Sequence, residues 1–293
     1  MGKSDMGNRQ RPIMATVILP VFNKLKHLPY VLLTLERNFW TCSFNWELLI
    51  IDGGSTDKTR EYILDYMTAT HLKISYVRFD WGGWVNPSLP RNYGTVLARG
   101  DILIYIDGDH VVNNNFINGA IEPFFVDDDQ MVVRAMVYDS TTGGIPGPQA
   151  NAIIQKLILQ GEYNALKWYE NLRIPVKNNR DKEMWSYAVK KEKIYQIGGH
   201  DMDFLGGWGR DEDWVMHALK HIGCRFNYSR SKDMSVIHLW HPKGGPNGVR
   251  DASKNHKVLE AKLKNIDKVI EHNKIRLVEI EQQAKFIKVA RNW

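Results

Sequence analysis

The sequence Asp101-Ile-Leu-Ile-Tyr-Ile-Asp-Gly-Asp-His110 joins a short apolar run to two carboxylates and an imidazole. Residues 102–106 are apolar or aromatic and mostly β-branched, which is typical of a strand buried on both faces. Ligands of open α/β sheets bind at the carboxyl ends of the strands. Two carboxylates one residue apart can hold a hard divalent cation there, and the cation can hold a diphosphate. The run therefore predicts a nucleotide-diphosphate site, with an Asp-rich turn as the alternative.

Strands and helices alternate at short intervals before this run. Such alternation predicts a parallel sheet with crossover helices, and hence an α/β fold. The expected strands cover residues 13–20, 46–51 and 73–79, and the expected helices cover residues 28–39, a segment from residue 58, and residues 91–98.

The second half of the chain has a less regular pattern. We expect strands at residues 131–138, 185–189 and 235–241, and helices at residues 151–171 and 213–222. Loops are expected at residues 141–148 and 242–248 because glycine and proline are concentrated there.

The chain has 293 residues, enough for one large domain or two small ones, and a formal net charge of +6. Residues 252–293 carry ten Lys or Arg and five Asp or Glu, which leaves 29 basic and 28 acidic residues elsewhere. The basic tail could contact nucleic acid, anionic lipid or an acidic partner, although most lysine-rich helices are simply solvated.

The composition favours a cytoplasmic protein. No apolar run approaches the ~20 residues that span a bilayer. Residues 1–11 are polar, so we expect no signal peptide. The only cysteines are Cys42 and Cys224, which fits a reducing compartment and no disulfide framework.

Apolar residues in the tail recur with a heptad rhythm, which predicts a helix of roughly 60 Å with one apolar seam. The helix could fold back on its own domain, or it could form a homo-oligomer through a coiled coil. The seam residues are Leu259, Leu263, Ile266, Ile270, Leu277, Ile280, Ala284 and Ile287, with Asn273 as a polar interruption.

Several motifs together resemble the GT-A glycosyltransferases of family 2. Val17-Ile-Leu-Pro-Val-Phe-Asn23 and Glu47-Leu-Leu-Ile-Ile-Asp-Gly-Gly-Ser-Thr-Asp57 are similar to the first two nucleotide-binding strands of that family. Arg91-Asn-Tyr-Gly94 resembles the segment that precedes its Asp-x-Asp motif, which here is Asp107-Gly-Asp109. The resemblance covers residues 13–241 and implies a mixed, mainly parallel sheet flanked by helices.

The downstream half resembles the galactosyltransferases that share this fold. Ile197-Gly-Gly-His-Asp201 and Gly207-Trp-Gly209 are similar to their acceptor-side region, and His238-Leu-Trp-His241 falls where they place a later metal ligand. We therefore expect a flexible N-terminus (1–12), a catalytic domain (13–250) and a basic C-terminal helix (251–293). The catalytic domain would divide into a nucleotide-binding half (13–110) and an acceptor-binding half (111–250).

For the metal, the resemblance implies Asp109 as the first ligand, with Asp107 contacting ribose or metal. It implies His241 as the second protein ligand, and His238 could be a third. His110 adjoins the motif and could lie just outside the ligand set. Imidazole ligands favour Mn²⁺ over Mg²⁺.

For the nucleotide, the resemblance implies that Phe22 stacks on uracil. The other residues expected on the donor side are Pro20 and Asn23 beside Phe22, Asp52 near the base, Gly108 within the motif, Arg91 at a phosphate or paired with a strand-end carboxylate, and Trp208 at the donor sugar or acceptor. Trp81 to Trp84 could form a flap over the site.

Asp211-Glu212-Asp213 is the candidate for the catalytic base. Inverting transfer needs a carboxylate that removes the proton of the acceptor hydroxyl. The spacing favours Glu212, and an alternative register makes Asp213 the base. Acids at a helix N-terminus also interact favourably with the helix dipole, so a purely structural role is the alternative.

The sequence thus predicts a metal-dependent, inverting glycosyltransferase that uses a UDP-sugar and a hydroxyl acceptor such as a glycan. One alternative is a retaining transferase of the peptide type, although that enzyme needs no base at the acid cluster. Another is an acceptor hydroxyl on a modified DNA base, which the basic tail would suit. A sugar-binding scaffold without activity is disfavoured because the metal and base positions are filled.

Overall fold

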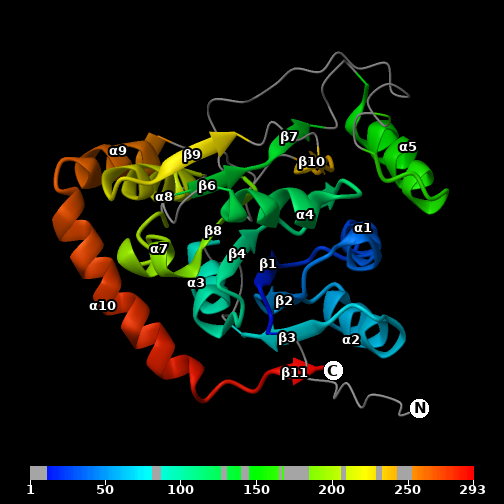
Figure 1. Cartoon of the computed structure of the whole chain (residues 1–293), viewed down its shortest axis with the longest axis horizontal. Coiled ribbons are helices and arrows are strands. Elements are labelled where there is room, and N and C mark those ends of the chain that lie inside the picture. Colours follow the sequence, from blue (N-terminus) through cyan, green and yellow to red (C-terminus); the bar gives the residue numbers. More distant parts are fainter. Residues whose placement is uncertain are drawn as a thin grey trace, which may run out of the picture.

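The computed structural model describes residues 12–80, 87–126, 131–139, 145–164, 167, 185–205, 209–228, 233–242 and 253–293. Among these residues, two β-sheets form the centre and helices cover them (Figure 1). The strands of the larger sheet are β1 (Ala15–Val21), β2 (Trp46–Asp52), β3 (Ile74–Arg78), β4 (Ile102–Tyr105), β6 (Met131–Arg134), β8 (Tyr187–Lys190), β9 (Arg225–Tyr228) and β11 (Ala290–Arg291).

The larger sheet has the strand order β11-β3-β2-β1-β4-β8-β6-β9. β1 pairs in parallel with β2 and β4, and β2 pairs in parallel with β3. β8 is antiparallel to β4 and β6, and β11 is antiparallel to β3. The expected mixed, mainly parallel sheet is confirmed.

The smaller sheet consists of β5 (His110–Val112), β10 (Ser235–His238) and β7 (Met136–Asp139), in the order β5-β10-β7. β10 is antiparallel to β5, and the register places His238 opposite His110. Pairing of strands more than 100 residues apart in the chain thus brings two imidazoles together directly after β4.

Helices lie on both faces of the larger sheet (Figure 1). Val17 and Leu19 of β1 pack into a core with the helices after β1 and β2, whereas Ile18 between them joins the core on the other face. The helices are α1 (Leu28–Thr41), α2 (Thr59–Ala69), α3 (Ser88–Leu97), α4 (Phe116–Ile121), the 3₁₀ helix η1 (Glu122–Phe125), α5 (Gly147–Leu159), α7 (Lys191–Gln196), α8 (Asp211–His221), α9 (Ser253–Leu263) and α10 (Ile266–Ala284).

Gly94 lets α3 lie directly against β1. A Cβ atom at this position would be 2.4 Å from Cγ2 of Ile18, closer than real contacts allow. The glycine of the Arg91-Asn-Tyr-Gly94 motif therefore sets how closely α3 approaches the central strand.

Two predicted elements of the second half are wrong in extent. The strand expected at residues 131–138 is two strands in different sheets, because the chain crosses at Ala135, whose N–H donates to the Ser186 carbonyl. In place of the helix expected at residues 151–171, α5 begins at Gly147 and ends at Leu159, and residues 165–166 and 168–171 of that prediction lie outside the described residues. Gly161 (φ +84°) then adopts the left-handed conformation that ends many helices.

The tail is two helices rather than the one long helix expected, with a break at residues 264–265. The apolar seam of the tail packs against the rest of the same chain. Of the two alternatives for the tail, the structure therefore has the helices folded back on their own domain. Asn273, the polar interruption, donates a hydrogen bond of 3.1 Å to the buried Asp201. The buried seam residues are Leu259, Ile270, Leu277, Ile280 and Ala284.

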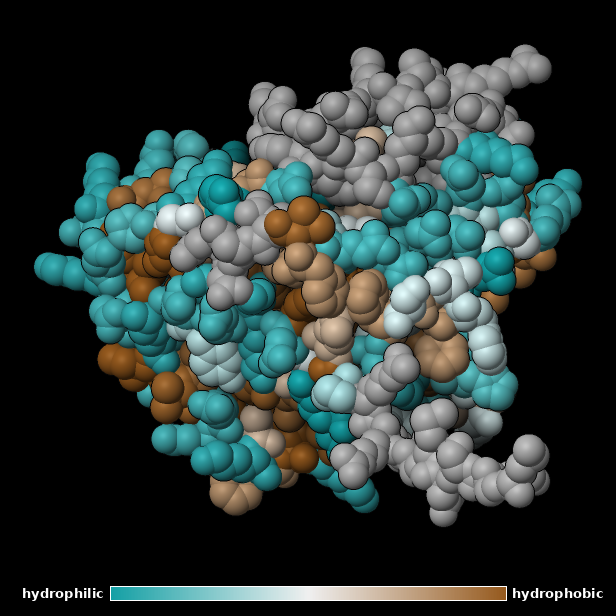
Figure 2. All heavy atoms as spheres, in the orientation of Figure 1, coloured by the Kyte–Doolittle hydropathy of each residue, from teal (hydrophilic) through white to brown (hydrophobic). Residues whose placement is uncertain are grey.

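The outward surface of the tail is mixed in character. Around the position of α9 and α10, hydrophilic and hydrophobic side chains alternate in Figure 2. Ile275 and Val278, for example, are 62% and 49% exposed among charged neighbours. None of the helices in the described part of the chain is long and apolar enough to cross a membrane.

Candidate functional site

The turn Asp107-Gly-Asp109 follows β4 and separates two groups of charged side chains. We call the first the cation cluster, which contains Asp109, Lys24, His110, His238 and His241. We call the second the acid cluster, which contains Arg91, Asp107, Asp211 and Glu212. One turn of chain thus supplies a carboxylate to each cluster.

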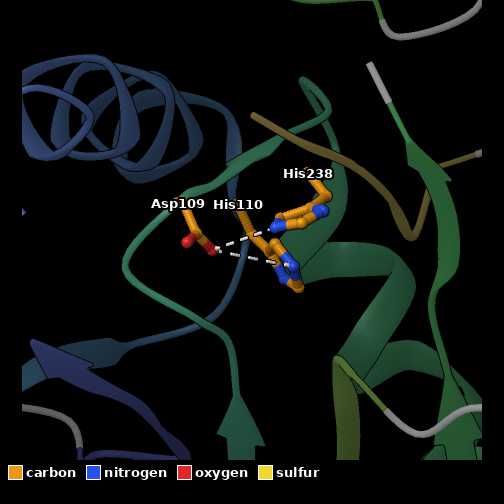
Figure 3. A group of neighbouring side chains, drawn as sticks. All are labelled: Asp109, His110 and His238. Atoms are coloured by element: carbon orange, nitrogen blue, oxygen red, sulfur yellow. Dashed lines mark ion pairs between the residues drawn. The ribbon is translucent and has the colours of Figure 1, made fainter. Parts of the chain in front are cut away.

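In the cation cluster, three imidazoles turn their Nε2 atoms toward Asp109. The distances to its carboxylate oxygens are 3.5 Å from His241, 3.9 Å from His238 and 4.0 Å from His110. One ligand atom from each of Asp109, His110 and His238 lies within 4.8 Å of the others, and Figure 3 shows these side chains converging. This donor set fits a divalent cation.

The opposite ring nitrogens of two imidazoles already have partners. Nδ1 of His110 lies 2.9 Å from Oγ of Ser186, and Nδ1 of His241 lies 3.1 Å from the Pro242 carbonyl. A proton on Nδ1 of His241 would be donated to that carbonyl, which leaves the Nε2 lone pair free. Such outer partners orient metal-binding histidines.

Lys24 is the cation that Asp109 holds in this structure. The residue lies just after β1, and its ammonium forms an ion pair with the Asp109 carboxylate. Burial alone would raise the pKa of Asp109, but Lys24, His238 and His110 together lower it below its ordinary value. The position beside Asp109 therefore attracts positive charge.

Two imidazoles of the cluster, those of His110 and His241, favour their neutral form. Burial lowers the pKa of His110 to about 4, and burial also lowers the pKa of His241. Metal ions bind neutral imidazole, so these two side chains are ready to bind at neutral pH without losing a proton.

In the acid cluster, one buried guanidinium meets three carboxylates. Nη1 of Arg91 lies 2.9 Å from Asp211, and Nη2 lies 2.8 Å from Asp107 and 2.7 Å from Glu212. One positive charge cannot balance three negative charges. The cluster therefore has an excess of negative charge that favours retention of a proton.

The excess charge affects Glu212 most. Burial raises the pKa of Glu212 well above its ordinary value, Arg91 opposes the shift, and the Asp211 and Asp107 carboxylates add to it. Burial also raises the pKa of Asp211. A carboxylate with a raised pKa is a stronger base, which is the property that proton removal from a hydroxyl requires.

Asp213 points elsewhere. Its carboxylate lies 2.8 Å from the partly exposed guanidinium of Arg210, which directly precedes α8. Arg210 itself has φ of 76°, an unusual backbone conformation for a residue other than glycine. The structure thus places Asp211 and Glu212 together on Arg91 and separates Asp213 from them.

Several residues expected around the nucleotide lie at the end of β1 and in the loop that follows it. Pro20 and Phe22 are half-buried at the end of β1. The side chain of Asn23 accepts a hydrogen bond of 2.8 Å from the Thr56 N–H, and its own N–H donates to Ser55. The loop after β1 is therefore fixed to the turn after β2.

Asp52, which is expected near the base, makes its hydrogen bonds within the protein. Its side chain is fully buried and accepts hydrogen bonds from the N–H groups of Gly54 and Ser55 and from the Tyr76 hydroxyl. Asp52 holds the turn after β2 because all these bonds are internal.

Other predicted residues also have different neighbours. Arg91 is paired with carboxylates, as the alternative interpretation had it, rather than free for a phosphate. Asp107 lies in the acid cluster, and Gly108 lies against Lys24 and the Pro20 carbonyl. Trp208 and the expected flap at residues 81–84 lie outside the described residues.

Three residues in or beside the two clusters were missed, or given too small a role, in the sequence analysis. Lys24 directly follows the Val17–Asn23 motif, and an isolated lysine gives no signal of its partner. His110 was expected outside the ligand set, but strand pairing places it opposite His238. The side chain of Asn92 forms two hydrogen bonds of 2.8 Å with the backbone of His200, one to its carbonyl and one from its N–H. In the sequence, only the position of Asn92 next to Arg91 could have suggested these contacts.

Comparison with known proteins gives concordant matches. The family described as Glycosyl transferase family 2 matches residues 16–184, more than half of the chain. Validoxylamine A glucosyltransferase of Streptomyces hygroscopicus subsp. jinggangensis is 23% identical over 232 residues, which cover 74% of this chain and 54% of that protein. Poly(ribitol-phosphate) beta-N-acetylglucosaminyltransferase TarS of Staphylococcus aureus is 26% identical over 132 residues, which cover 45% of this chain and 22% of that protein. The chain thus spans about half the length of the first relative and less of the second.

Solved structures show the same fold. TarS 1-349 of S. aureus in complex with UDP matches with a TM-score of 0.53 at 16% identity, over 79% of this chain and 62% of that one. Mannosyltransferase PcManGT from Pyrobaculum calidifontis in complex with GDP-Man and Mn²⁺ matches with a TM-score of 0.53 at 16% identity, over 94% of this chain and 74% of that one. The sheet, the motifs and the family match agree: this chain belongs to glycosyl transferase family 2 and has the GT-A fold.

Proposed function

We propose that this protein is a metal-dependent, inverting glycosyltransferase that transfers a sugar from a UDP-sugar to a hydroxyl group of a polyhydroxylated acceptor such as a glycan. The observation that carries the proposal is the placement of the two clusters on either side of one turn. Such a transfer uses a cation at the leaving diphosphate and a base at the acceptor hydroxyl, and the turn Asp107-Gly-Asp109 gives one carboxylate to each cluster. Residues 13–110 would form the donor half and residues 111–250 the acceptor half.

The cation cluster supports a bound divalent metal. Asp109 with His110, His238 and His241 offers one carboxylate and three imidazoles, a set that favours Mn²⁺ over Mg²⁺. A structural neighbour is described in complex with Mn²⁺. A cation bound there would stabilise the negative charge that develops on the leaving diphosphate.

The acid cluster supports Glu212 as the base. Its carboxylate takes the proton from the acceptor hydroxyl as that oxygen forms a bond to the anomeric carbon. The bond from the anomeric carbon to the diphosphate oxygen breaks on the opposite side, and the diphosphate leaves with the bonding electrons. Attack opposite to the leaving group inverts the configuration of the sugar.

Arg91 and Lys24 support these steps without reacting. Arg91 fixes the orientation of the Glu212 carboxylate through the hydrogen bond of 2.7 Å. Lys24 would exchange its Asp109 partner for diphosphate oxygens when the metal and donor enter. Its ammonium would then add positive charge beside the leaving group.

The choice of uracil rests on two supports of different kinds. Phe22 occupies the position where the family resemblance implies stacking on the base, and it is half-buried at the end of β1. TarS, a relative in sequence and in structure, is described in complexes with UDP and UDP-GlcNAc. Because PcManGT is described with GDP-Man at the same TM-score, the fold alone does not select the base.

The acceptor proposal follows the names of the relatives. Validoxylamine A and poly(ribitol-phosphate) appear in the names of two relatives, and ribitol is a polyol. We therefore place a polyol or glycan hydroxyl beside Glu212 rather than a hydroxyl on DNA.

The test is a transfer assay with UDP-glucose, UDP-GlcNAc, UDP-galactose and GDP-mannose, each with Mn²⁺ or with EDTA. We expect product from a UDP-sugar only when Mn²⁺ is present, and NMR of the anomeric proton should show the opposite configuration to the donor. A product with retained configuration would eliminate Glu212 as the base. Transfer that persists in EDTA would refute metal dependence, and use of GDP-mannose alone would refute the choice of uracil.

A further inference from the structure

The metal-ligand segment after β10 has little support from the sheet. β10 ends at His238, and the following Leu239 N–H makes one backbone hydrogen bond, to the Asp109 carbonyl. Trp240 and His241 have no strand assignment. The position of the His241 imidazole must therefore be fixed by something other than a β-ladder.

Asn151 of α5 supplies the missing support. Its side-chain amide donates a hydrogen bond of 2.7 Å to the Trp240 carbonyl and accepts one of 2.8 Å from the Trp240 N–H. The amide thus satisfies both backbone groups of the residue next to His241, as a neighbouring strand would. His27 adds a third contact, with Nε2 at 3.2 Å from the same carbonyl.

Gly147, one helical turn before Asn151, holds the other side of Trp240. A Cβ atom at Gly147 would lie 2.1–2.3 Å from three atoms of the indole ring, so the ring packs directly on the helix backbone. Residues four apart lie on the same helix face. The first turns of α5 therefore hold Trp240 by its ring and by its backbone.

We propose that Gly147 and Asn151 are positioning residues that set the metal affinity of the cation cluster. The inference rests on the proposed metal dependence and goes beyond it, because neither residue offers a ligand. Trp240 is covalently joined to His241, whose Nε2 lies 3.5 Å from Asp109, and it is two residues from His238. A shift of the segment would move two imidazoles together relative to Asp109.

This arrangement predicts that loosening the segment weakens Mn²⁺ binding more than Mg²⁺ binding. Mn²⁺ gains from imidazole ligands, whereas Mg²⁺ prefers oxygen ligands and retains water. Loosening the segment would therefore weaken Mn²⁺ binding and leave Mg²⁺ binding, which depends on Asp109, nearly unchanged. A general loss of structure would weaken both.

The experiment is calorimetric titration of the full chain with Mn²⁺ and with Mg²⁺. The variants are Asn151→Ala, which removes both hydrogen bonds, and Asn151→Asp, which keeps an acceptor for the Trp240 N–H. Lys156→Ala is the matched control, since this exposed residue lies on the same helix. Circular dichroism and urea unfolding report whether each variant is folded.

We expect Asn151→Ala to weaken Mn²⁺ binding about 10- to 100-fold, the usual effect of losing an outer partner of a metal ligand. Asn151→Asp should lie between it and the wild type, and Lys156→Ala should match the wild type. If a folded Asn151→Ala variant binds Mn²⁺ as tightly as the wild type does, the positioning role of Asn151 is overturned and the proposed metal dependence stands.

If the wild type binds no Mn²⁺, the proposed metal dependence is overturned, and the positioning role is overturned with it. If Asn151→Ala does not fold, Asn151→Asp decides between these outcomes.

Discussion

The cation cluster and the acid cluster share one turn but have opposite electrostatic designs. In the first, one carboxylate is surrounded by a lysine and three imidazoles, and its pKa is lowered. In the second, one guanidinium is surrounded by three carboxylates, and the pKa of Glu212 is raised. The difference shows how residues two apart in the chain, Asp107 and Asp109, can serve a metal site and a proton-transfer site.

The largest effect should come from Glu212→Gln. Glutamine can still accept the hydrogen bond from Arg91 but cannot take a proton, so the transfer rate should fall about 10²- to 10⁴-fold. Initial rates at saturating donor and Mn²⁺ measure the loss. Asp213→Asn is the matched control because Asp213 pairs with Arg210 outside the cluster. A loss in Asp213→Asn with none in Glu212→Gln would show that the base is Asp213 instead, and equal losses in both would refute the assignment of the base to Glu212 alone.

Arg91→Met should have the next largest effect, on stability. It would leave three carboxylates without their cation, and removing one partner of a buried ion pair costs about 3–5 kcal/mol of unfolding free energy. Urea unfolding at pH 8 measures the loss. The comparison is Arg210→Met, whose pair is partly exposed and should contribute less than about 1 kcal/mol. Similar losses in both variants would mean that Arg91 does not hold the cluster together.

Lys24→Met should strengthen Mn²⁺ binding by about tenfold, a change of ~1.4 kcal/mol, because the ammonium no longer competes for Asp109. Affinity for UDP in the presence of Mn²⁺ should fall, since the positive charge beside the diphosphate is lost. Lys26→Met on the same loop controls for net charge, because Lys26 is exposed. Weaker Mn²⁺ binding in Lys24→Met would show that the lysine supports the ion rather than excludes it.

The smallest effect should be a change in the pH dependence of stability. A carboxyl group with a raised pKa binds its proton more tightly in the folded state, so stability falls as pH rises from the unfolded pKa through the folded one. Glu212→Gln removes this penalty and should be more stable than the wild type above that window, with no difference at pH 4. Urea unfolding between pH 4 and 9 gives both curves, with the exposed Glu279→Gln as control. Parallel curves for wild type and Glu212→Gln would refute the raised pKa.

The sequence predicted the nucleotide half of the fold better than the second half. Residues 102–106 are buried on both sides because β4 is central, and continuous apolar runs of this kind reveal central strands directly. The break at Ala135 and the early end of α5 depend on which distant strand is available for pairing and on Gly161. Apolar periodicity contains little of that information.

The sequence identified those candidate site residues that belong to a recognisable motif. Asp109 could be named because it follows a buried strand, and Glu212 because the downstream half resembles the galactosyltransferases that share this fold. Lys24, Asn151 and the internal role of Asp52 were not predictable, because each depends on partners that only the folded chain brings together. The division of Asp107 and Asp109 between two clusters likewise depends on where Arg91 lies.

The most direct test of the two-cluster account is a calorimetric titration of UDP into wild type, Asp109→Asn and Glu212→Gln, each with Mn²⁺ and with EDTA. We predict Mn²⁺-dependent UDP binding in the wild type and in Glu212→Gln, and its loss in Asp109→Asn. Unchanged Mn²⁺-dependent binding in Asp109→Asn would contradict the account, and so would its loss in Glu212→Gln, because the two sites would then not be separate.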